Sequence, residues 1–259
     1  MKNFKELEAI CDLIIDNNMP KQHVLFMNKE EYNDTSIMLK TIGSKGVSTT
    51  VVPNTNIPCD ILIYAEITFK KIKKEKKKKK MNLDINDALN TLMFDYSQYY
   101  QRIADELPSG CNVVEVGCAD GISAIYLAQE LHKRNKTFKL YMIDNMDYGK
   151  YEQMKTIYTN IIKSGLGEYI EVIPKDSVTA SKDFNDGYID FLFLDSSHEY
   201  QETKDSIHAW FPKIKDGCIL SGHDFIGHPE VYKAVTETIP LFVTRNDIPD
   251  RVFDAERFL

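Results

Sequence analysis

The sequence predicts an α/β protein in which a doubly wound, mostly parallel sheet follows a small N-terminal α/β unit. From residue 111 onward, apolar runs of strand length alternate with amphipathic stretches of helix length, a spacing typical of parallel sheets with helices on both faces. A lysine-rich run at residues 70–80 separates this part from the shorter one before it. We therefore expect a small domain over residues 1–69, a linker over 70–85 and a larger domain over 86–259.

The N-terminal part contains three apolar runs and one amphipathic stretch. The runs HVLFM (23–27), STTVV (48–52) and DILIYAEI (60–67) predict strands, and residues 29–43 predict a helix that ends at Gly43. The sequence of this part shows no nucleophile, metal-ligand cluster or phosphate-binding loop. An interaction or capping role is therefore expected for it.

The larger part opens with a helical lead-in over residues 81–107 and continues with five strands. The expected strands are NVVEVG (112–117), KLYMID (139–144), YIEVIP (169–174), IDFLFLD (189–195) and GCILSGHD (217–224). A helix over residues 228–237 and a last strand within 251–259 complete the prediction. Because ligands of such sheets bind at the carboxyl ends of the strands, the residues that follow each run are the candidates for function.

Composition limits the class of protein. A chain of 259 residues with 43% apolar residues can bury a substantial core. The five cysteines show no CxxC spacing, which argues against a zinc ribbon and a disulfide framework and favours a reducing cytoplasm. No apolar run is long enough to span a bilayer, and the N-terminus lacks the pattern of a signal peptide. We therefore expect an unprocessed cytoplasmic protein.

The charge is unevenly distributed. Residues 70–80 carry nine lysines and one glutamate, a local charge of +8. Because the net charge of the chain is −7, the remaining residues carry −15. Such a run attracts phosphate backbones and anionic lipid. It has no interleaved aromatic residues for stacking on bases, and like charges at this density are typical of a solvated linker. A linker is therefore favoured over nucleic-acid binding, and homo-oligomerisation is left open.

A glycine-rich turn follows the first strand of the larger part. Glu115 is followed by Gly117 and Gly121, and an amphipathic helix begins directly afterwards. Glycines in such a turn allow a ligand to approach the backbone, and the helix offers unpaired amides. The G-x-x-x-G spacing differs from the dinucleotide fingerprint. The next strand ends at Asp144, where an acid can accept hydrogen bonds from the two hydroxyls of a ribose, although a simple loop aspartate is the alternative.

Through E-x-G-x-x-x-G at 115–121 and the acid at Asp144, the chain resembles the class I S-adenosylmethionine-dependent methyltransferases over roughly residues 86–259. Within that class, residues 189–225 look like the sugar and macrolide O-methyltransferases, in which I-D-x-x-H-x-Y precedes a helix, a glycine turn and an H-D or E-D pair. The sequence departs by Leu-Asp-Ser-Ser-His at 194–198 and by Asp-Gly-Cys at 216–218.

The resemblance implies roles for particular residues. Asp195 and Asp224 would bind a divalent cation, with Mg²⁺ expected, and His223 would be a further ligand. A hard ion prefers oxygen donors. If His223 is not a ligand, it would contact the ligands without binding the ion; if it is one, it would shift the metal preference of the site toward a softer ion. Asp176 and Ser177, after the third strand, would lie near the adenine, although a simple turn also explains them.

The chemistry supports a metal and a base. The sulfonium of S-adenosylmethionine is a strong electrophile, so the protein must mainly align an oxygen nucleophile and remove its proton. A divalent ion lowers the pKa of an oxygen bound to it. His198, three residues after Asp195, would be the base, because the ordinary pKa of histidine suits neutral pH. In the simpler interpretation, Ser196 or Ser197 only caps a helix.

The sequence thus predicts a cation-dependent O-methyltransferase that acts on a hydroxyl of a sugar or another small polyhydroxylated molecule. Two alternatives remain open at this point. A metal-dependent hydroxylase-like relative would contain iron or use a redox cosubstrate. A catalytically inactive scaffold would bind an anionic partner through the lysine run, with a strong dependence on salt.

Overall fold

The computed structural model describes residues 21–26, 47–54, 62–69, 96–147, 150–239, 243–244 and 252–256. Within these residues, seven strands form one sheet in the order β6-β5-β4-β7-β8-β10-β9. Their bounds are Cys111–Val116 (β4), Phe138–Ile143 (β5), Ile170–Ile173 (β6), Ile189–Leu194 (β7), Ile214–Gly222 (β8), Val243–Thr244 (β9) and Phe253–Glu256 (β10). The five strands expected from the sequence and the last strand are all present.

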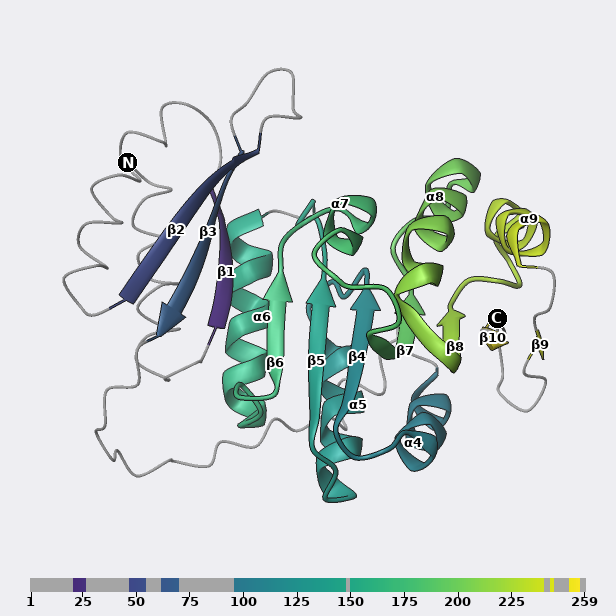
Figure 1. Cartoon of the computed structure of the whole chain (residues 1–259), viewed down its shortest axis with the longest axis horizontal. Helices are drawn as coiled ribbons and strands as arrows, with labels where there is room; N and C mark the ends of the chain where they lie inside the picture. The colour runs from purple at the N-terminus through teal and green to yellow at the C-terminus, as the bar shows by residue number, and fades with distance from the viewer. Residues whose placement is uncertain are drawn as a thin grey trace.

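The sheet is mostly parallel and changes winding direction beside β4. Strands β4, β5 and β6 follow one another outward and pair in parallel, and β7 then returns to the other side of β4, also in parallel (Figure 1). β8 continues in parallel beside β7, while β10 pairs antiparallel with β8 and β9. The winding reverses between β4 and β7, which is the position where doubly wound sheets bind their ligands.

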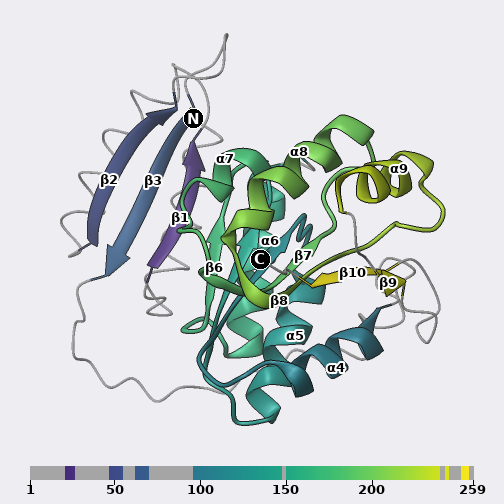
Figure 2. The same cartoon turned by 45° about the vertical axis from the view of Figure 1, so that its right-hand side comes forward.

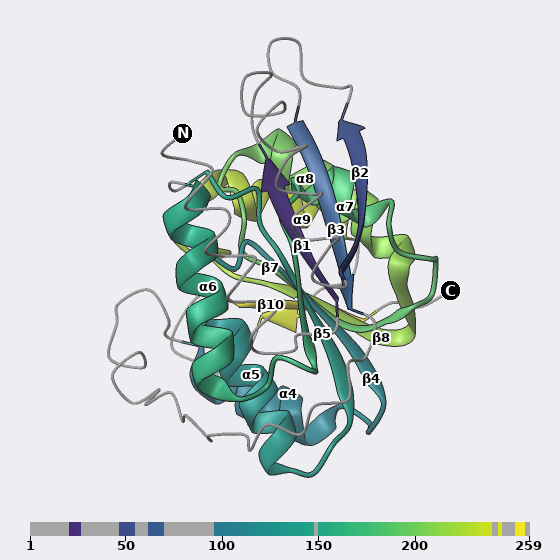
Figure 3. The ribbon, with the colours of Figure 1, turned by 90° about the vertical axis from the view of Figure 1, so that its left-hand side faces the viewer.

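Helices cover both faces of this sheet (Figure 3). Their bounds are Ser97–Glu106 (α4), Ile122–Lys133 (α5), Lys150–Ser164 (α6), Ser177–Ser181 (α7), Tyr200–Trp210 (α8) and Pro229–Thr238 (α9). Apolar side chains of α4, α5 and α6 pack in one core, and those of α7, α8 and α9 pack in a second core on the opposite face. Successive residues of each strand contribute their side chains to the two cores in turn, because successive side chains of a strand point to opposite faces of the sheet. This explains why the central strands are apolar throughout.

Three described strands lie in the N-terminal part, where the sequence predicts three. β1 (Lys21–Phe26), β2 (Val47–Asn54) and β3 (Leu62–Phe69) form a separate antiparallel sheet in the order β1-β3-β2. β1 lies beside β6 at the edge of the larger sheet (Figure 2). The helix expected over residues 29–43 and the lysine-rich linker lie outside the described residues, and the domain division stays a prediction.

The lead-in helix and β8 differ in detail from the sequence prediction. Of the lead-in over residues 81–107, only the part from 96 onward is described, and it contains α4. The glycine turn expected at 216–218 is an irregularity within β8, where the pairing with β7 shifts register, and Gly217 has a φ of +72° there. A β-bulge absorbs extra residues without ending a strand. No helix among the described residues has the length and apolarity that crossing a bilayer demands.

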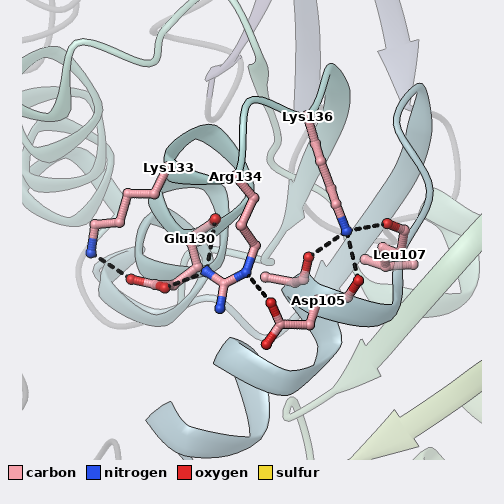
Figure 4. Close-up of polar contacts among 7 residues, drawn as sticks. Asp105, Leu107, Glu130, Lys133, Arg134 and Lys136 are labelled. Atoms are coloured by element: carbon pink, nitrogen blue, oxygen red, sulfur yellow. Dashed lines mark hydrogen bonds and ion pairs between the residues drawn. The ribbon is translucent and has the colours of Figure 1, made fainter.

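A polar network fastens α4 to the end of α5 (Figure 4). Arg134 contacts Asp105 on one side and Glu130 on the other, at 2.6 Å in each case. The ammonium of Lys136 donates to the carbonyl oxygens of Ala104, Asp105 and Leu107 at 2.7, 2.8 and 2.5 Å. These are carbonyls at the end of α4, which intrahelical bonds leave unpaired. The network fixes the helix that carries the buried Tyr99 and Tyr100 and follows directly on the buried Tyr96.

Replacing Lys136 by methionine is expected to lower the free energy of unfolding by about 1.5–3 kcal/mol, since it removes hydrogen bonds from a charged donor to three carbonyls. The matched control is Lys133→Met, because Lys133 pairs with Glu130 at the surface and its side chain is 63% exposed. That change should cost at most about 1 kcal/mol. Urea denaturation of both variants measures the difference, and equal losses would contradict a specific role for Lys136.

Candidate active site

Backbone hydrogen bonds bring the predicted site residues to one edge of the sheet. The amide of Asp195 donates to the carbonyl of Val116 at 2.8 Å, and the amide of His223 donates to the carbonyl of Leu194 at 3.0 Å. The ends of β4, β7 and β8 are thereby aligned side by side. Asp195 directly follows β7 and His223 directly follows β8, so their side chains lie close together.

The glycine turn has the backbone conformation that its sequence predicts. Gly117 and Gly121 have φ values of +88° and +79°, in the left-handed region, and Gly121 is the residue before α5. A Cβ atom on Gly117 would lie 2.1 Å from the carbonyl oxygen of Asp195. Only glycine fits this position without a shift of the backbone. The turn is therefore packed directly against the end of β7.

Asp144 at the end of β5 holds the glycine turn. Its Oδ2 accepts from the amide of Ala119 at 2.9 Å, and its Oδ1 accepts from the amide of Met146 at 2.7 Å and from the side chain of Gln153 at 3.1 Å. Burial raises the pKa of Asp144, although these hydrogen bonds act in the opposite direction. Since a carboxylate oxygen accepts more than one hydrogen bond, Oδ2 retains capacity for a further donor.

Glu115 is enclosed by its own chain. Its Oε2 accepts from the hydroxyl of Tyr100 at 2.6 Å and its Oε1 from the hydroxyl of Ser123 at 2.5 Å, and the residue is 1% exposed. Burial raises the pKa of Glu115 to about 7, against the opposing effect of these two hydrogen bonds. Glu115 thus supports the start of α5, which carries Ser123.

The raised pKa of Glu115 predicts a pH dependence of stability. Its folded-state pKa lies above the unfolded value of about 4.3, so its contribution is fully present below that value and is lost as the pH rises toward about 7. Between about pH 5 and about pH 8, the wild type should lose about 2 kcal/mol more unfolding free energy than Glu115→Gln does. Urea denaturation at both pH values tests this, and parallel pH profiles would contradict it.

Asp176 and Ser177 lie at the end of β6, on the far side of β5. Asp176 precedes α7 and its Oδ1 accepts from the amide of Thr179 at 2.9 Å, which is an N-cap contact. The hydroxyl of Ser177 accepts from the indole of Trp210 at 2.9 Å. Both residues therefore have structural partners at the strand-end edge, and their proximity to an adenine stays a prediction.

Asp195, His223 and Asp224 form the centre of the site. Nδ1 of His223 lies 3.6 Å from Oδ1 of Asp195 and 3.3 Å from Oδ1 of Asp224. One donor atom from each residue lies within 4.8 Å of the others, a spacing that can hold a metal ion. Asp224 has a φ of +57°, an uncommon left-handed conformation that aspartate tolerates better than most residues.

The charges of this cluster are coupled. Burial alone would lower the pKa of His223, but hydrogen bonding and attraction to Asp195 and Asp224 outweigh burial and raise the pKa to about 10. Burial would raise the pKa of Asp224, but His223 and His198 outweigh burial and lower the pKa to about 2. In the absence of a cation, a protonated His223 thus balances part of the negative charge of the two acids.

His198 lies against the same cluster. Its Nε2 contacts Oδ2 of Asp224 at 2.7 Å, and its side chain is 53% exposed. The interpretation of Ser196 or Ser197 as a helix cap is wrong, because the residue before α8 is Glu199 and no side chain caps it. Ser197 instead accepts from the amide of Glu199 and donates to Glu202. His198 therefore faces Asp224 from a loop.

Two residues near the cluster were not assigned to it from the sequence. The buried hydroxyl of Tyr96 donates to Oδ2 of Asp195 at 3.0 Å, and its ring lies 4.9 Å from that of His223. Nε2 of His228 lies 3.6 Å from Oδ1 of Asp224, and its ring lies 4.0 Å from that of His198. Sequence spacing gave no signal for either contact.

A pocket opens beside the cluster. Asp195, His198, His223 and Asp224 line it together with apolar side chains that include Val231 and Phe253. Most of the lining residues are polar, and Leu194, Val231 and Phe253 are the apolar ones. The arrangement can hold a cation, position an acceptor oxygen near it and accept a proton.

Comparisons with known proteins bear on the domain and on the fold. Residues 114–225 match the model of a family described as a methyltransferase domain. By structure, the chain is similar to a putative rRNA methylase from Clostridium thermocellum, with a TM-score of 0.51 and 12% identity over 65% of this chain and 98% of that one. It is also similar to a protein from Corynebacterium glutamicum, with a TM-score of 0.52 and 11% identity over 68% and 88%. At such identities the likeness shows the fold alone, and no match is found among curated proteins. The match covers residues 114–225, which include the glycine turn and Asp144 at the strand ends of the doubly wound sheet, and it supports an S-adenosylmethionine-dependent methyltransferase.

Proposed function

We propose that the protein is a cation-dependent O-methyltransferase whose acceptor is a hydroxyl of a sugar or another small polyhydroxylated molecule. The observation that carries the proposal is the joint placement of Asp195, His223 and Asp224 at two adjacent strand ends, with His198 against Asp224. Two carboxylates and an exposed histidine beside a pocket are the groups that deprotonation of a hydroxyl requires.

The cofactor would be held by the glycine turn and Asp144. S-adenosylmethionine supplies an electrophilic methyl group when it is bound. Gly117 and Gly121 give the turn its positive φ values, and Asp144 directs Oδ2 toward that turn. A Cβ atom on Gly117 would lie 2.1 Å from the carbonyl oxygen of Asp195, so the turn proposed to hold the cofactor packs against the acid proposed to bind the cation. The edges of this cofactor-binding region would be formed by Glu115, Asp176 and Ser177.

The donor set fits a divalent cation. Asp195 and Asp224 supply carboxylate oxygens and His223 supplies Nδ1, all within 4.8 Å of one another. When bound, the ion would make the acceptor hydroxyl more acidic. Carboxylates suit Mg²⁺, whereas the imidazole suits first-row transition ions as well. The chain's own contribution is to hold Asp195 in place, through the hydroxyl of Tyr96 and the backbone contact to Val116.

His198 would accept the proton of the acceptor hydroxyl. We assign the tautomer in which Nε2–H donates to Oδ2 of Asp224, which leaves the lone pair of Nδ1 for the proton. Asp224 then stabilises the imidazolium that forms. The side chain of His198 is exposed, so an acceptor can reach it.

Calorimetric titration of S-adenosylhomocysteine, beside a methyl-transfer assay on a panel of sugars with and without EDTA, tests the proposal. Asp144→Ala should weaken cofactor binding at least about tenfold, the loss of one to two good hydrogen bonds. The matched control is Asp147→Ala, an exposed acid of the same loop that bonds Asn145. Methyl transfer that EDTA does not affect would refute the cation dependence, and equal binding by both variants would refute the role of Asp144.

A further inference from the structure

We propose that His198, Asp224 and His228 form a second metal site, which binds a divalent transition-metal ion and thereby blocks proton acceptance by His198. The three residues come from the loop after β7, the end of β8 and the residue before α9. Their donor atoms all lie within 4.8 Å of one another. We call this group the His-Asp-His site.

The carboxylate of Asp224 lies between the two imidazoles. Its Oδ2 is 2.7 Å from Nε2 of His198 and its Oδ1 is 3.6 Å from Nε2 of His228. Ligands held at about 2.1 Å from a first-row ion lie about 3.0–3.4 Å apart in octahedral or tetrahedral geometry. The two observed distances fall on either side of that range. Because the two contacts involve different oxygens of the carboxylate, Asp224 would bind the ion through both oxygens or rotate so that one oxygen serves both imidazoles.

The His-Asp-His site differs from the neighbouring Asp195, His223 and Asp224 group in chemistry and access. It offers two imidazoles and one carboxylate, a set that favours first-row transition ions, whereas the neighbouring group offers two carboxylates and one imidazole. The side chains of His198 and His228 are 53% and 38% exposed, whereas that of His223 is 12% exposed. An ion can thus reach the His-Asp-His site directly from solvent. The two groups share only Asp224.

Occupancy of this site would change the protonation of His198. The ion binds the lone pair of Nε2, so Nε2 carries no proton and a neutral imidazole keeps its proton on Nδ1. Nδ1–H is a donor and cannot accept the proton of an acceptor hydroxyl. Transition-metal binding and the base role of His198 are therefore mutually exclusive. This consequence rests on the proposed function, whereas metal binding itself does not.

Titration of Co²⁺ into the purified full-length protein, followed by its visible absorption, tests the binding. The wild type should bind Co²⁺, and His228→Gln should weaken the affinity at least tenfold. The control His132→Gln, an exposed histidine at the end of α5, should leave the affinity unchanged. Asp195→Asn should also leave it unchanged, because Asp195 belongs only to the neighbouring group. If Asp195→Asn abolishes Co²⁺ binding and His228→Gln does not, the ion occupies the neighbouring group and the proposal is wrong.

Inhibition by Zn²⁺ at saturating Mg²⁺ tests the consequence for the reaction. Each variant is compared with its own activity in the absence of Zn²⁺, and His228→Gln should need at least tenfold more Zn²⁺ for half inhibition than the wild type. Equal inhibition of both would refute the blocking of His198. Absence of methyl transfer together with Co²⁺ binding that depends on His228 would overturn the proposed function and leave the His-Asp-His site standing.

Discussion

Replacing Asp224 by asparagine is expected to reduce kcat by about 10²- to 10⁴-fold, the range that loss of acid-base catalysis spans. Oδ1 of Asp224 lies beside His223, and its Oδ2 contacts Nε2 of His198. One substitution therefore removes a ligand charge from the proposed cation site and the partner that orients the proposed base. When catalytic groups act as a unit, removing one costs about as much activity as removing several. The loss in kcat should therefore approach that of a double Asp195→Asn, His198→Gln variant.

The same substitution has a predicted effect on stability. The pKa of Asp224 is lowered to about 2 by His223 and His198 despite burial, so the stabilisation by its ionised form is present above the unfolded value of about 3.9 and is lost as the pH falls through about 2. At neutral pH, Asp224→Asn should cost about 2 kcal/mol of unfolding free energy.

Steady-state kinetics and thermal melting separate the two effects of Asp224→Asn. The matched control is Asp205→Asn on α8, since Asp205 is exposed and bonds Gln201. Its kcat and melting temperature should match the wild type. An Asp224→Asn enzyme that is folded and retains more than about a tenth of the wild-type kcat would contradict the central role of this carboxylate.

The larger sheet could be predicted because its signals are local. Each central strand is a short apolar run bounded by polar or glycine residues, and both faces of the run are buried, as in IDFLFL of β7. Such runs indicate a parallel sheet irrespective of what packs on them. The glycine turn was predictable for the same reason, since Gly117 and Gly121 adopt the positive φ values that glycine favours.

The contacts that complete the site could not be predicted because they join distant parts of the chain. Tyr96 and Asp195 are 99 positions apart, and Tyr100 and Glu115 meet only because α4 packs under the strands. A tyrosine at helical spacing is usually part of a core, and these residues are buried as that pattern predicts. Their hydroxyls acquire polar partners only from the tertiary packing. His228 is only four positions from Asp224, but no helix among the described residues includes both, so their contact depends on the path of the chain after β8.

Gly117→Ala is expected to disrupt the proposed cofactor site and the position of Asp195 at the same time. The φ of Gly117 is +88°, and a Cβ atom there would lie 2.1 Å from the carbonyl oxygen of Asp195, closer than atoms can approach. Either the turn or the end of β7 must therefore move. Because Asp195 carries a proposed ligand and the turn would hold the cofactor, both ways of relieving the clash should impair function. We expect at least a tenfold loss of S-adenosylhomocysteine affinity and a lower melting temperature.

The control for this prediction is Gly110→Ala, which isolates the cost of the backbone conformation. Gly110 has a φ of +86°, almost the same as Gly117, but no atom lies within 4 Å of the added Cβ. Alanine there should cost about 1–3 kcal/mol of stability through strain alone and leave cofactor affinity unchanged. Calorimetry and thermal melting of both variants separate strain from contact. Equal cofactor affinity in the two variants would show that the approach of Gly117 to Asp195 is not needed for binding, whereas a loss confined to Gly117→Ala would tie the cofactor turn to the end of β7.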